Sequence, residues 1–293
     1  MKRLVNAMTV DVEDYFHAAA FDRIVPRTSW LQRESRVVRN THRLLECFHR
    51  RQVRATFFVL GWVAQRFPSL VREIASLGHE LASHGYHHQL IYMLTRDQFR
   101  DDVRRAKATI EDAGGVAVTG YRAPSFSIVA SSMWALDVLI EEGHTYDASV
   151  FPIYHDRYGV PGAPRHAHVI ERGAGRIVEV PASTVRVGAM NIPIAGGGYF
   201  RMLPYTATKW GIARINAEGA PAVFYIHPWE VDAYQPRLPV SRITALRHYG
   251  NVGTTLTRLD QLMTDFPFDT VAAALAARRP VPVTAVARWA HAK

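Results

Sequence analysis

Two patterns of hydrophobic and polar positions alternate along the first half of the chain. The first is a short run of β-branched and aromatic residues, as in residues 53–61 (VRATFFVLG). The second spaces apolar residues three or four positions apart, as in residues 35–51. The first pattern predicts a buried strand and the second an amphipathic helix. Residues 150–220, which are rich in glycine and proline, follow neither pattern regularly.

Predicted strands and helices follow one another repeatedly. After a first strand that ends near residue 12, the predicted strands cover residues 53–61, 79–85, 118–125, 144–149, 177–183 and 222–230. The predicted helices cover residues 35–51, 64–77, 95–113, 132–142 and 256–266. This alternation is typical of an α/β fold in which helices cover a parallel sheet.

Titratable residues gather where the predicted strands end. The carboxyl ends of parallel strands meet at one edge of a sheet or barrel, and the functional groups of α/β proteins lie there. The residues at these positions are Asp11, Glu13 and Asp14, then His84, His87 and His88, then Arg122, Asp147 and His227. We therefore expect them to surround one site.

A metal site is predicted from two of these clusters. His84 and His88 are four residues apart, which places two imidazoles on the same side of a helical turn. With one carboxylate they form a donor set that commonly holds zinc or iron(II) and leaves positions open for water and substrate. Alternation along the strand places Glu13 on the side of Asp11, but the strand ends here, so either Glu13 or Asp14 can be the ligand. Alternatively, Asp14 caps the next turn and the histidines are surface residues.

Further residues suit the hydrolysis of a carbonyl compound. Asp11 lies deeper in the first strand, where it can take a proton from a water activated by the metal. Arg122 is expected to hold the Asp11 carboxylate in its ionised form. Pro124 sets a turn and leaves the backbone N–H of Ser125 as a candidate donor to an oxyanion.

The late strand adds a candidate acid. His227, at the end of FYIHPWE, suits general acid catalysis on a leaving amine, and Asp147 is the candidate to orient it. The segment IAGGGYFR (195–202) lacks the lysine and spacing of a phosphate-binding loop, and instead predicts a loop on the substrate side. The candidate substrate-binding residues are Ser125, Tyr199 and Trp229. The ring of Tyr199 can stack on a sugar.

Composition limits the remaining possibilities. The 293 residues are 48% hydrophobic, enough for one large core, and we expect a single domain over residues 1–293. A net charge of +9 would allow nucleic acid, anionic lipid or an acidic glycan as a partner. The basic residues are scattered and no nucleic-acid-binding motif occurs, so we expect no nucleic-acid partner. The single Cys47 excludes an internal disulfide framework and a multi-cysteine zinc site.

No apolar stretch approaches the roughly 18 residues that a membrane-spanning helix requires. The opening residues MKRLVNAMTV contain no apolar stretch of signal-peptide length. We expect a protein without an integral membrane segment, located in the cytoplasm or at the cytoplasmic face of the membrane. The basic, proline-interrupted tail 281–293 is expected to be mobile.

Five segments resemble, in order, the motifs of the polysaccharide deacetylases with NodB homology, carbohydrate esterase family 4. These segments are TVDVED, SHGYHH, YRAPS, YDAS and YIHPWE. The resemblance covers residues 8–230. Residues 231–280 resemble the C-terminal extension of a subgroup that is encoded beside exopolysaccharide and exosortase (PEP-CTERM) loci.

The resemblance implies a distorted (β/α) barrel of seven or eight strands, with the extension packed on it. It also implies a metal-dependent enzyme, holding zinc, cobalt or another divalent ion, that removes acetyl groups from the N-acetylated amino sugars of a glycan. The residues that match the family's functional positions are Asp11 as the base, His84 and His88 as metal ligands, Arg122 as the residue that steadies the base, and Asp147 and His227 as the acid pair.

Three departures from the family pattern widen the choice of function. DVED stands where two adjacent aspartates are usual, Gly85 replaces a serine or threonine, and no Tyr-Gly pair follows Pro124. These departures resemble a branch with peptidoglycan-deacetylase-like and allantoinase-like members, some of which act on small amides. The expected function is N-deacetylation of an exopolysaccharide or its lipid-linked precursor, in association with membrane-bound assembly machinery. The alternatives are hydrolysis of a small non-peptide amide, and glycan binding without catalysis.

Overall fold

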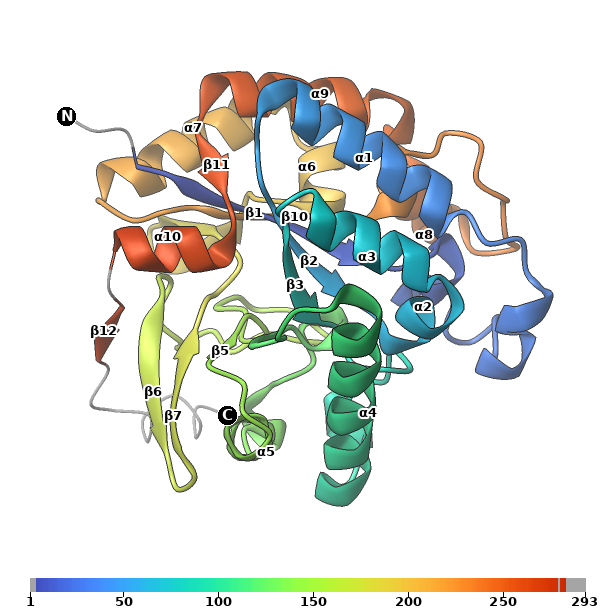
Figure 1. Ribbon diagram of the computed structural model, residues 1–293. Helices are drawn as coiled ribbons and strands as arrows, with labels where there is room; N and C mark the ends of the chain where they lie inside the picture. Colours follow the sequence, from blue (N-terminus) through green and yellow to red (C-terminus); the bar gives the residue numbers. More distant parts are fainter. Residues whose placement is uncertain (1–3, 279, 283–293) are drawn as a thin grey trace.

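The computed structural model describes residues 4–278 and 280–282. Figure 1 shows a central sheet with helices packed around its outer side. The strands are β1 (Asn6–Val12), β2 (Thr56–Val59), β3 (Glu80–Ser83), β4 (Gly120–Tyr121), β5 (Tyr146–Asp147), β6 (His168–Arg172), β7 (Gly175–Glu179), β8 (Thr184–Val187), β9 (Met190–Pro193), β10 (Val223–Ile226), β11 (Phe268–Asp269) and β12 (Val281–Pro282).

The α-helices are α1 (Val37–Arg51), α2 (Gly61–Arg66), α3 (Pro68–Ser76), α4 (Arg96–Gly114), α5 (Ala135–Glu141), α6 (Gly197–Met202), α7 (Tyr205–Ala217), α8 (Arg242–Tyr249), α9 (Val252–Asp265) and α10 (Val271–Ala277). Short 3-10 helices are η1 (Tyr15–His17), η2 (Ala19–Phe21), η3 (Arg27–Gln32), η4 (Ile91–Met93), η5 (Pro124–Phe126), η6 (Ala130–Ser132) and η7 (Pro228–Val231).

The strand order is β10-β1-β2-β3-β4-β5-β7-β6-β12, with β11 beside β1. Neighbouring strands from β10 to β7 are parallel, and β6 is antiparallel to β7. Every residue of β1 and β2 is buried, because both faces of these central strands are covered. Most of their residues are apolar, and the buried polar side chains of Thr9 and Asp11 in β1 accept hydrogen bonds from Arg122. The predicted α/β fold with a parallel sheet, distorted into a barrel, is confirmed.

The barrel closes between β7 and β10 without a continuous strand pair. The chain after β7 runs beside β10, where the Ser183 N–H donates to the Val223 carbonyl (3.3 Å) and Gly196 forms an isolated bridge with Tyr225. Gly196 has a φ of +125°, and a Cβ atom there would lie 2.2 Å from the Tyr225 carbonyl oxygen. Only glycine fits this conformation and this close approach of two backbones.

The C-terminal residues pack on the barrel. α9 lies along α1, as Figure 1 shows at the top of the molecule, and β11 extends the sheet with Phe268 opposite Asn6. Arg54, which follows α1, forms an ion pair with Asp269 (2.8 Å). Among the described residues, no helix combines the length and the apolar character needed to cross a membrane. Most of the tail that we expected to be mobile, residues 283–293, lies outside the described residues.

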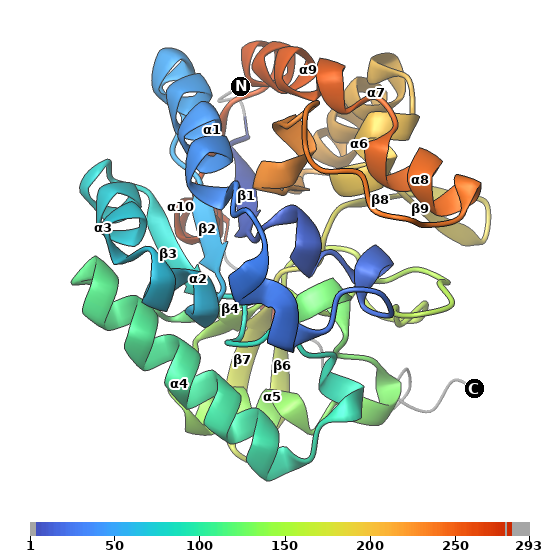
Figure 2. The same ribbon diagram turned by 90° about the vertical axis from the view of Figure 1, so that its right-hand side faces the viewer.

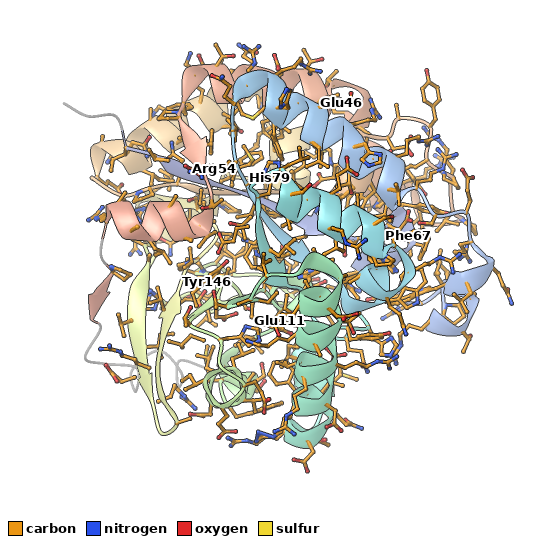
Figure 3. All side chains as sticks on the ribbon, viewed as in Figure 1. Glu46, Arg54, Phe67, His79, Glu111 and Tyr146 are labelled. Carbon is orange, nitrogen blue, oxygen red and sulfur yellow. The ribbon has the colours of Figure 1, made fainter. Side chains whose placement is uncertain are left out.

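Three parts of the fold differ from the hydrophobic pattern. The predicted helix 64–77 is two helices, because Pro68 begins α3 and Phe67 between them is non-helical (φ −131°, ψ 59°; Figure 3). The pattern does not predict α7, whose buried face combines Ile212 and Ile215 with the small residues Thr208 and Gly211. It also does not predict the 3-10 helices η1, η2 and η3, which follow β1.

The substitution Gly196→Ala tests the closure of the barrel. We expect it to lower the free energy of unfolding by roughly 3 to 5 kcal/mol, since it adds an unfavourable backbone conformation and a clash with β10. Gly188→Ala is the matched control: Gly188 also has a positive φ (+58°), but nothing lies within 4 Å of the added Cβ. We expect that variant to lose about 1 kcal/mol. Denaturant unfolding measures both, and equal small losses would contradict this role of Gly196.

Candidate active site

An open cleft of about 650 Å³ is lined by residues at the carboxyl ends of β1, β3 and β10. This end of the barrel faces the viewer in Figure 2, where the short helices after β1 (dark blue) lie in front of the strands. The predicted site residues that line the cleft are Asp11, Glu13, His84, His88, Ser125, His227 and Trp229. Segments more than 200 residues apart in the chain therefore meet here.

Glu13, His84 and His88 lie close enough together to bind one metal ion. Each offers one ligand atom, and the three atoms lie within 4.8 Å of one another. Glu13 directly follows β1, and His84 directly follows β3. The Nδ1 atom of His84 donates to the Arg122 carbonyl (2.8 Å), so its other ring nitrogen is left for the cluster.

The two histidines share a loop, and the helical turn that we predicted from their spacing is not formed. The chain turns at Gly85, which has a φ of +71°, and Asp102 of α4 accepts hydrogen bonds from the N–H groups of Tyr86 (2.8 Å) and His87 (3.3 Å). These bonds hold the loop so that His88, itself at a φ of +52°, returns toward the end of β1. Its Nε2 atom lies 2.8 Å from Oε2 of Glu13.

Electrostatics set the protonation states of the cluster. Burial opposes a charged His88 ring, but the Glu13 carboxylate outweighs it and raises the His88 pKa, so this ring has to release a proton when a metal ion binds. Burial opposes ionisation of Glu13, but the imidazoles of His88, His227 and His84 outweigh it and lower the Glu13 pKa well below its usual range. Burial lowers the pKa of His84 to about 4, which keeps this imidazole neutral at neutral pH. The indole N–H of Trp229 donates to Oε1 of Glu13 (3.0 Å) and fixes the carboxylate.

Asp14, the other candidate carboxylate, points away from this cluster. One of its oxygens accepts from the Tyr15 N–H (3.0 Å). The other accepts from the Ser35 hydroxyl (2.6 Å) and from the N–H groups of Arg36 (2.8 Å) and Val37 (3.1 Å). Asp14 thus caps η1 and the start of α1, which was the alternative interpretation, and the structure brings Glu13 to the histidines in its place.

Asp11 is held by a buried ion pair. The Arg122 guanidinium, fully buried, donates to Oδ1 of Asp11 (2.6 Å) and to the hydroxyl of Thr9 (2.8 Å). It also stacks over the Phe58 ring at 4.1 Å from the ring centroid. Oδ2 of Asp11 faces His227, whose Nε2 lies 3.8 Å away. The pair gives the buried Asp11 carboxylate a charge-assisted hydrogen bond beside the cleft.

His227 is oriented by a residue that the sequence analysis missed. Its Nδ1 atom donates to Oε1 of Glu230 (2.6 Å), and the buried Arg201 donates to the other oxygen of Glu230 (2.6 Å). Burial opposes a charged imidazole, but Glu13, Glu230 and Asp11 raise the His227 pKa to about 9. An acid three residues after a strand-end histidine is a capping-box spacing, and this signal could have indicated Glu230.

Family models match two parts of the chain. Residues 21–139 match the model for polysaccharide deacetylases. We refer to residues 21–139 as the deacetylase region because of this similarity, which covers less than half of the chain. Residues 148–276 match the model of a domain of unknown function (DUF3473). His84, His88 and Arg122 lie in the deacetylase region, whereas His227, Glu230 and Arg201 lie in the second region, so the cleft is built from both.

Parts of the chain are also similar to individual deacetylases. A peptidoglycan-N-acetylglucosamine deacetylase of Bacillus cereus is 30% identical over 98 residues, which are 33% of this chain and 36% of that protein. A peptidoglycan deacetylase of Helicobacter pylori is 32% identical over 123 residues, 40% of each protein. The chain therefore spans no more than 40% of the length of these relatives. The crystal structure of a candidate polysaccharide deacetylase from Mycobacterium smegmatis shares the fold, with a TM-score of 0.62 at 21% identity over 97% of this chain and 95% of that chain.

The residues of the cleft fit a divalent metal. Two imidazoles and one carboxylate are a donor set typical of zinc, and they leave coordination positions for water and substrate. The His84 contact to the Arg122 carbonyl is the outer hydrogen bond that metal-bound histidines usually make. Glu13, His84 and His88 would hold the ion.

Asp147, which we expected to orient His227, does not contact it. Its carboxyl accepts a hydrogen bond from Ser149 and lies beside that of Glu179, deep in the barrel. Burial raises the pKa of Asp147 to about 6, and burial together with Asp147 raises the pKa of Glu179 further. Ionisation of one buried carboxyl disfavours ionisation of the other, so the two neighbouring groups on the paired strands β5 and β7 are not both charged.

The candidate substrate-binding residues have different surroundings. Ser125 lines the cleft with a φ of +52°, and none of the described residues accepts a hydrogen bond from its N–H. Trp229 is held between the rings of His248 and His227, at centroid distances of 4.2 and 5.1 Å, so neither face is free for a sugar. Tyr199 contacts Tyr158 beside the cleft, while Gly197 and Gly198 of the same helix line it.

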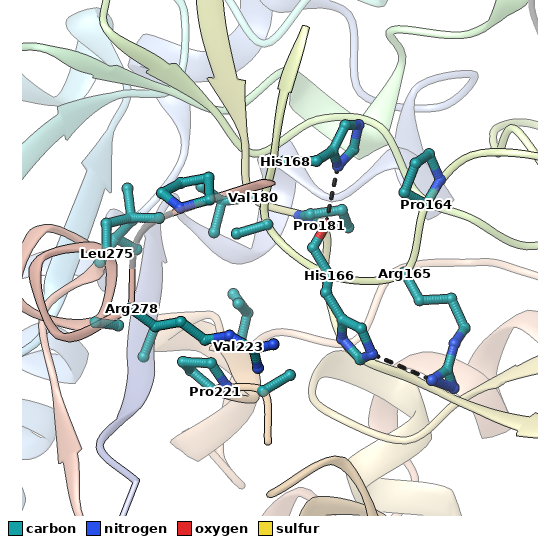
Figure 4. Close-up of a pocket in the computed structure, with 16 residues that line it drawn as sticks. Pro164, Arg165, His166, His168, Val180, Pro181, Pro221, Val223, Leu275 and Arg278 are labelled. Atoms are coloured by element: carbon teal, nitrogen blue, oxygen red, sulfur yellow. Dashed lines mark hydrogen bonds between the residues drawn. The ribbon is translucent and has the colours of Figure 1, made fainter. Parts of the chain in front are cut away.

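A second cavity, of about 250 Å³, lies where the barrel closes between β7 and β10 (Figure 4). Its walls are mainly apolar and include Val180, Val223 and Leu275. His166 and Arg165 at its edge both contact Glu218. None of the predicted site residues lines this cavity, so we assign the chemistry to the larger cleft.

Two variants distinguish the candidate carboxylate ligands. We expect Glu13→Gln to lower zinc affinity at least 100-fold, because it replaces a charged ligand by a neutral amide. Asp14→Asn should bind zinc within about threefold of the unsubstituted protein but lose about 1 to 2 kcal/mol of stability, because it weakens a cap. Zinc content after dialysis against a competing chelator measures both, and loss of zinc in Asp14→Asn alone would contradict the assignment.

The partner of His227 can be identified by titration of the metal-free protein. We expect the His227 ring to titrate at a pKa of about 9, and Glu230→Gln to lower that pKa by roughly 1 to 3 units. Because the folded pKa lies above the unfolded one, this ion pair stabilises the protein below pH 6.5 and that contribution is lost as the pH rises through 9. Asp147→Asn is the control and should leave the His227 pKa unchanged in an NMR titration. The opposite pattern would restore Asp147 as its partner.

Proposed function

We propose that the protein is a metal-dependent hydrolase that removes N-acetyl groups from the amino sugars of an exopolysaccharide or its lipid-linked precursor. One observation carries the proposal. Two candidate proton-transfer groups, Asp11 and His227, lie beside the three residues that could hold a metal ion. The Nε2 atom of His227 is 3.8 Å from Oδ2 of Asp11 and 3.7 Å from Oε1 of Glu13.

The proposed reaction assigns a task to each residue. When bound, a divalent ion supplies Lewis acidity and lowers the pKa of water, and zinc is the ion that this donor set favours. Asp11 accepts the proton of the attacking water, and Arg122 orients its carboxylate through a hydrogen bond to Oδ1. The free N–H of Ser125 donates to the oxyanion that develops on the acetyl oxygen.

His227 completes the proposed reaction by donating the proton that the leaving amine requires. Its raised pKa leaves it protonated at neutral pH, as a general acid must be before the bond breaks. Glu230 accepts from Nδ1 and so directs the Nε2–H toward the cleft. Without this contact the ring could rotate or lose its proton, and cleavage of the C–N bond would slow.

The shape of the cleft favours a glycan over a small amide. Its lining extends from residues 18–23 past the donor set to residues 155–158 and 244–248, and it is open to solvent. An open cleft of this extent suits several sugar units. We propose membrane-bound assembly machinery as the partner, and action in the cytoplasm or at its membrane face, from the resemblance of residues 231–280 described above.

The proposed activity is tested by acetate release. Purified protein loaded with zinc or cobalt should release acetate from N-acetylated oligosaccharides, and removal of the metal should abolish the reaction. We expect Asp11→Asn and His227→Ala each to lower kcat/KM by roughly 100- to 10,000-fold, because each removes one proton-transfer group. Glu73→Gln on the outer face of α3 is the control.

Other outcomes would indicate the alternatives. Release from a small cyclic amide but from no oligosaccharide would favour the amide hydrolase. Glycan binding without any turnover, unchanged in Asp11→Asn and His227→Ala, would favour a non-catalytic binding component and overturn the proposal.

A further inference from the structure

The outer wall of the cleft carries three arginines from distant parts of the chain. Arg23 follows η2, Arg157 lies in the loop between β5 and β6, and Arg247 lies on α8. All three are exposed, and none of them forms an ion pair with a carboxylate in the part of the chain that the structure describes. Their charge is therefore directed to the solvent inside the cleft.

The loop that carries Arg157 is fixed against the rest of the wall. The Arg157 guanidinium donates to the Ala19 carbonyl (3.1 Å), which ties this loop to η2 beside Arg23. The His155 ring stacks on Tyr158 with their centroids 3.8 Å apart, and Tyr158 stacks on the buried Phe151. Arg157 is thus held at the cleft by packing and a backbone contact.

Two carboxylates, Asp156 and Asp22, lie near the three arginines, so the guanidinium groups outnumber the acids in this part of the cleft. Asp156 contacts His155 (2.9 Å) and is exposed, and Asp22 is the other acid near Arg157. Burial lowers the pKa of His155, and Arg157 and Arg247 lower it further, which places both guanidinium groups near this ring. Deeper in the cleft, Asp11 and Glu230 are paired with Arg122 and Arg201.

We propose that the substrate is an anionic glycan, in which a carboxylate or phosphate close to the N-acetylated sugar binds Arg23, Arg157 and Arg247. This inference rests on the proposed function, since it names the substrate class of the same cleft. A guanidinium matches the planar oxygens of a carboxylate or phosphate with two parallel hydrogen bonds. Three such groups from three segments can follow an acidic sugar chain along the wall.

Binding measurements separate this inference from the proposed reaction, because binding does not require turnover. The first pair of ligands is a hyaluronan tetrasaccharide, which carries uronate and N-acetylglucosamine, and the neutral chitotetraose. The second pair is N-acetylglucosamine 1-phosphate and neutral N-acetylglucosamine. Calorimetry on the zinc-loaded full chain compares the unsubstituted protein with the triple variant Arg23→Gln, Arg157→Gln, Arg247→Gln. Arg72→Gln is the matched control: Arg72 is an exposed arginine on α3 outside the cleft.

We expect an anionic ligand to bind about tenfold or more tightly than its neutral counterpart, and the preference to weaken with salt. The triple variant should lose most of that preference while its affinity for chitotetraose stays within about twofold, and Arg72→Gln should keep the preference. Preference for the hyaluronan ligand would identify a uronate, and preference for the phosphorylated sugar would identify a phosphate.

Two results would overturn the inference: equal affinity for charged and neutral ligands, or a preference that persists in the triple variant. A loss of affinity for both kinds of ligand would likewise overturn it, since the arginines would then only support the wall. Acetate release from neutral oligosaccharides without any charge preference would leave the proposed function intact. An arginine-dependent preference without acetate release from any substrate would instead remove the proposed function and keep the anionic ligand.

Discussion

The burial of carboxylates at the end of β1 is the constraint on which the rest of the site depends. Asp11 and Glu13 are each 2% exposed, and an uncompensated charge at such depth costs several kcal/mol. Arg122 compensates Asp11, while the Trp229 indole and the imidazoles compensate Glu13. These partners follow β4, β10 and β3, so the strand order and the chemistry of the cleft are set by the same contacts.

The second matched region contributes more than a covering layer. Arg201 is buried, binds Glu230 and donates to the backbone carbonyls of Arg247, His248 and Gly250 (each 2.9 Å). It therefore links the helix that follows the glycine run to the end of α8 and to the orientation of His227. In our proposal, the deacetylase region supplies the histidine ligands and Arg122, whereas the region of unknown function supplies the acid and much of the cleft wall.

The sequence indicates the strands and the residues at their ends well, because buried parallel strands have continuous apolar runs with abrupt polar ends. It leaves open which carboxylate joins the histidines, because the direction of a side chain just past a strand depends on the next turn. Asp14 caps that turn through Ser35 and the start of α1, a contact that no local pattern encodes. The position of Asp147 at a strand end and the resemblance both assign it to His227, yet its neighbour Glu179 comes from a strand whose pairing the sequence does not show.

The central claim is that Glu13, His84 and His88 share one divalent ion. The most direct test is anomalous diffraction from a crystal of the zinc-loaded protein, recorded at the zinc absorption edge. The account predicts one strong peak bonded to a carboxylate oxygen of Glu13 and to one ring nitrogen each of His84 and His88, at about 2.0–2.2 Å. A peak bonded to Asp14, or a site without both histidines, would contradict it.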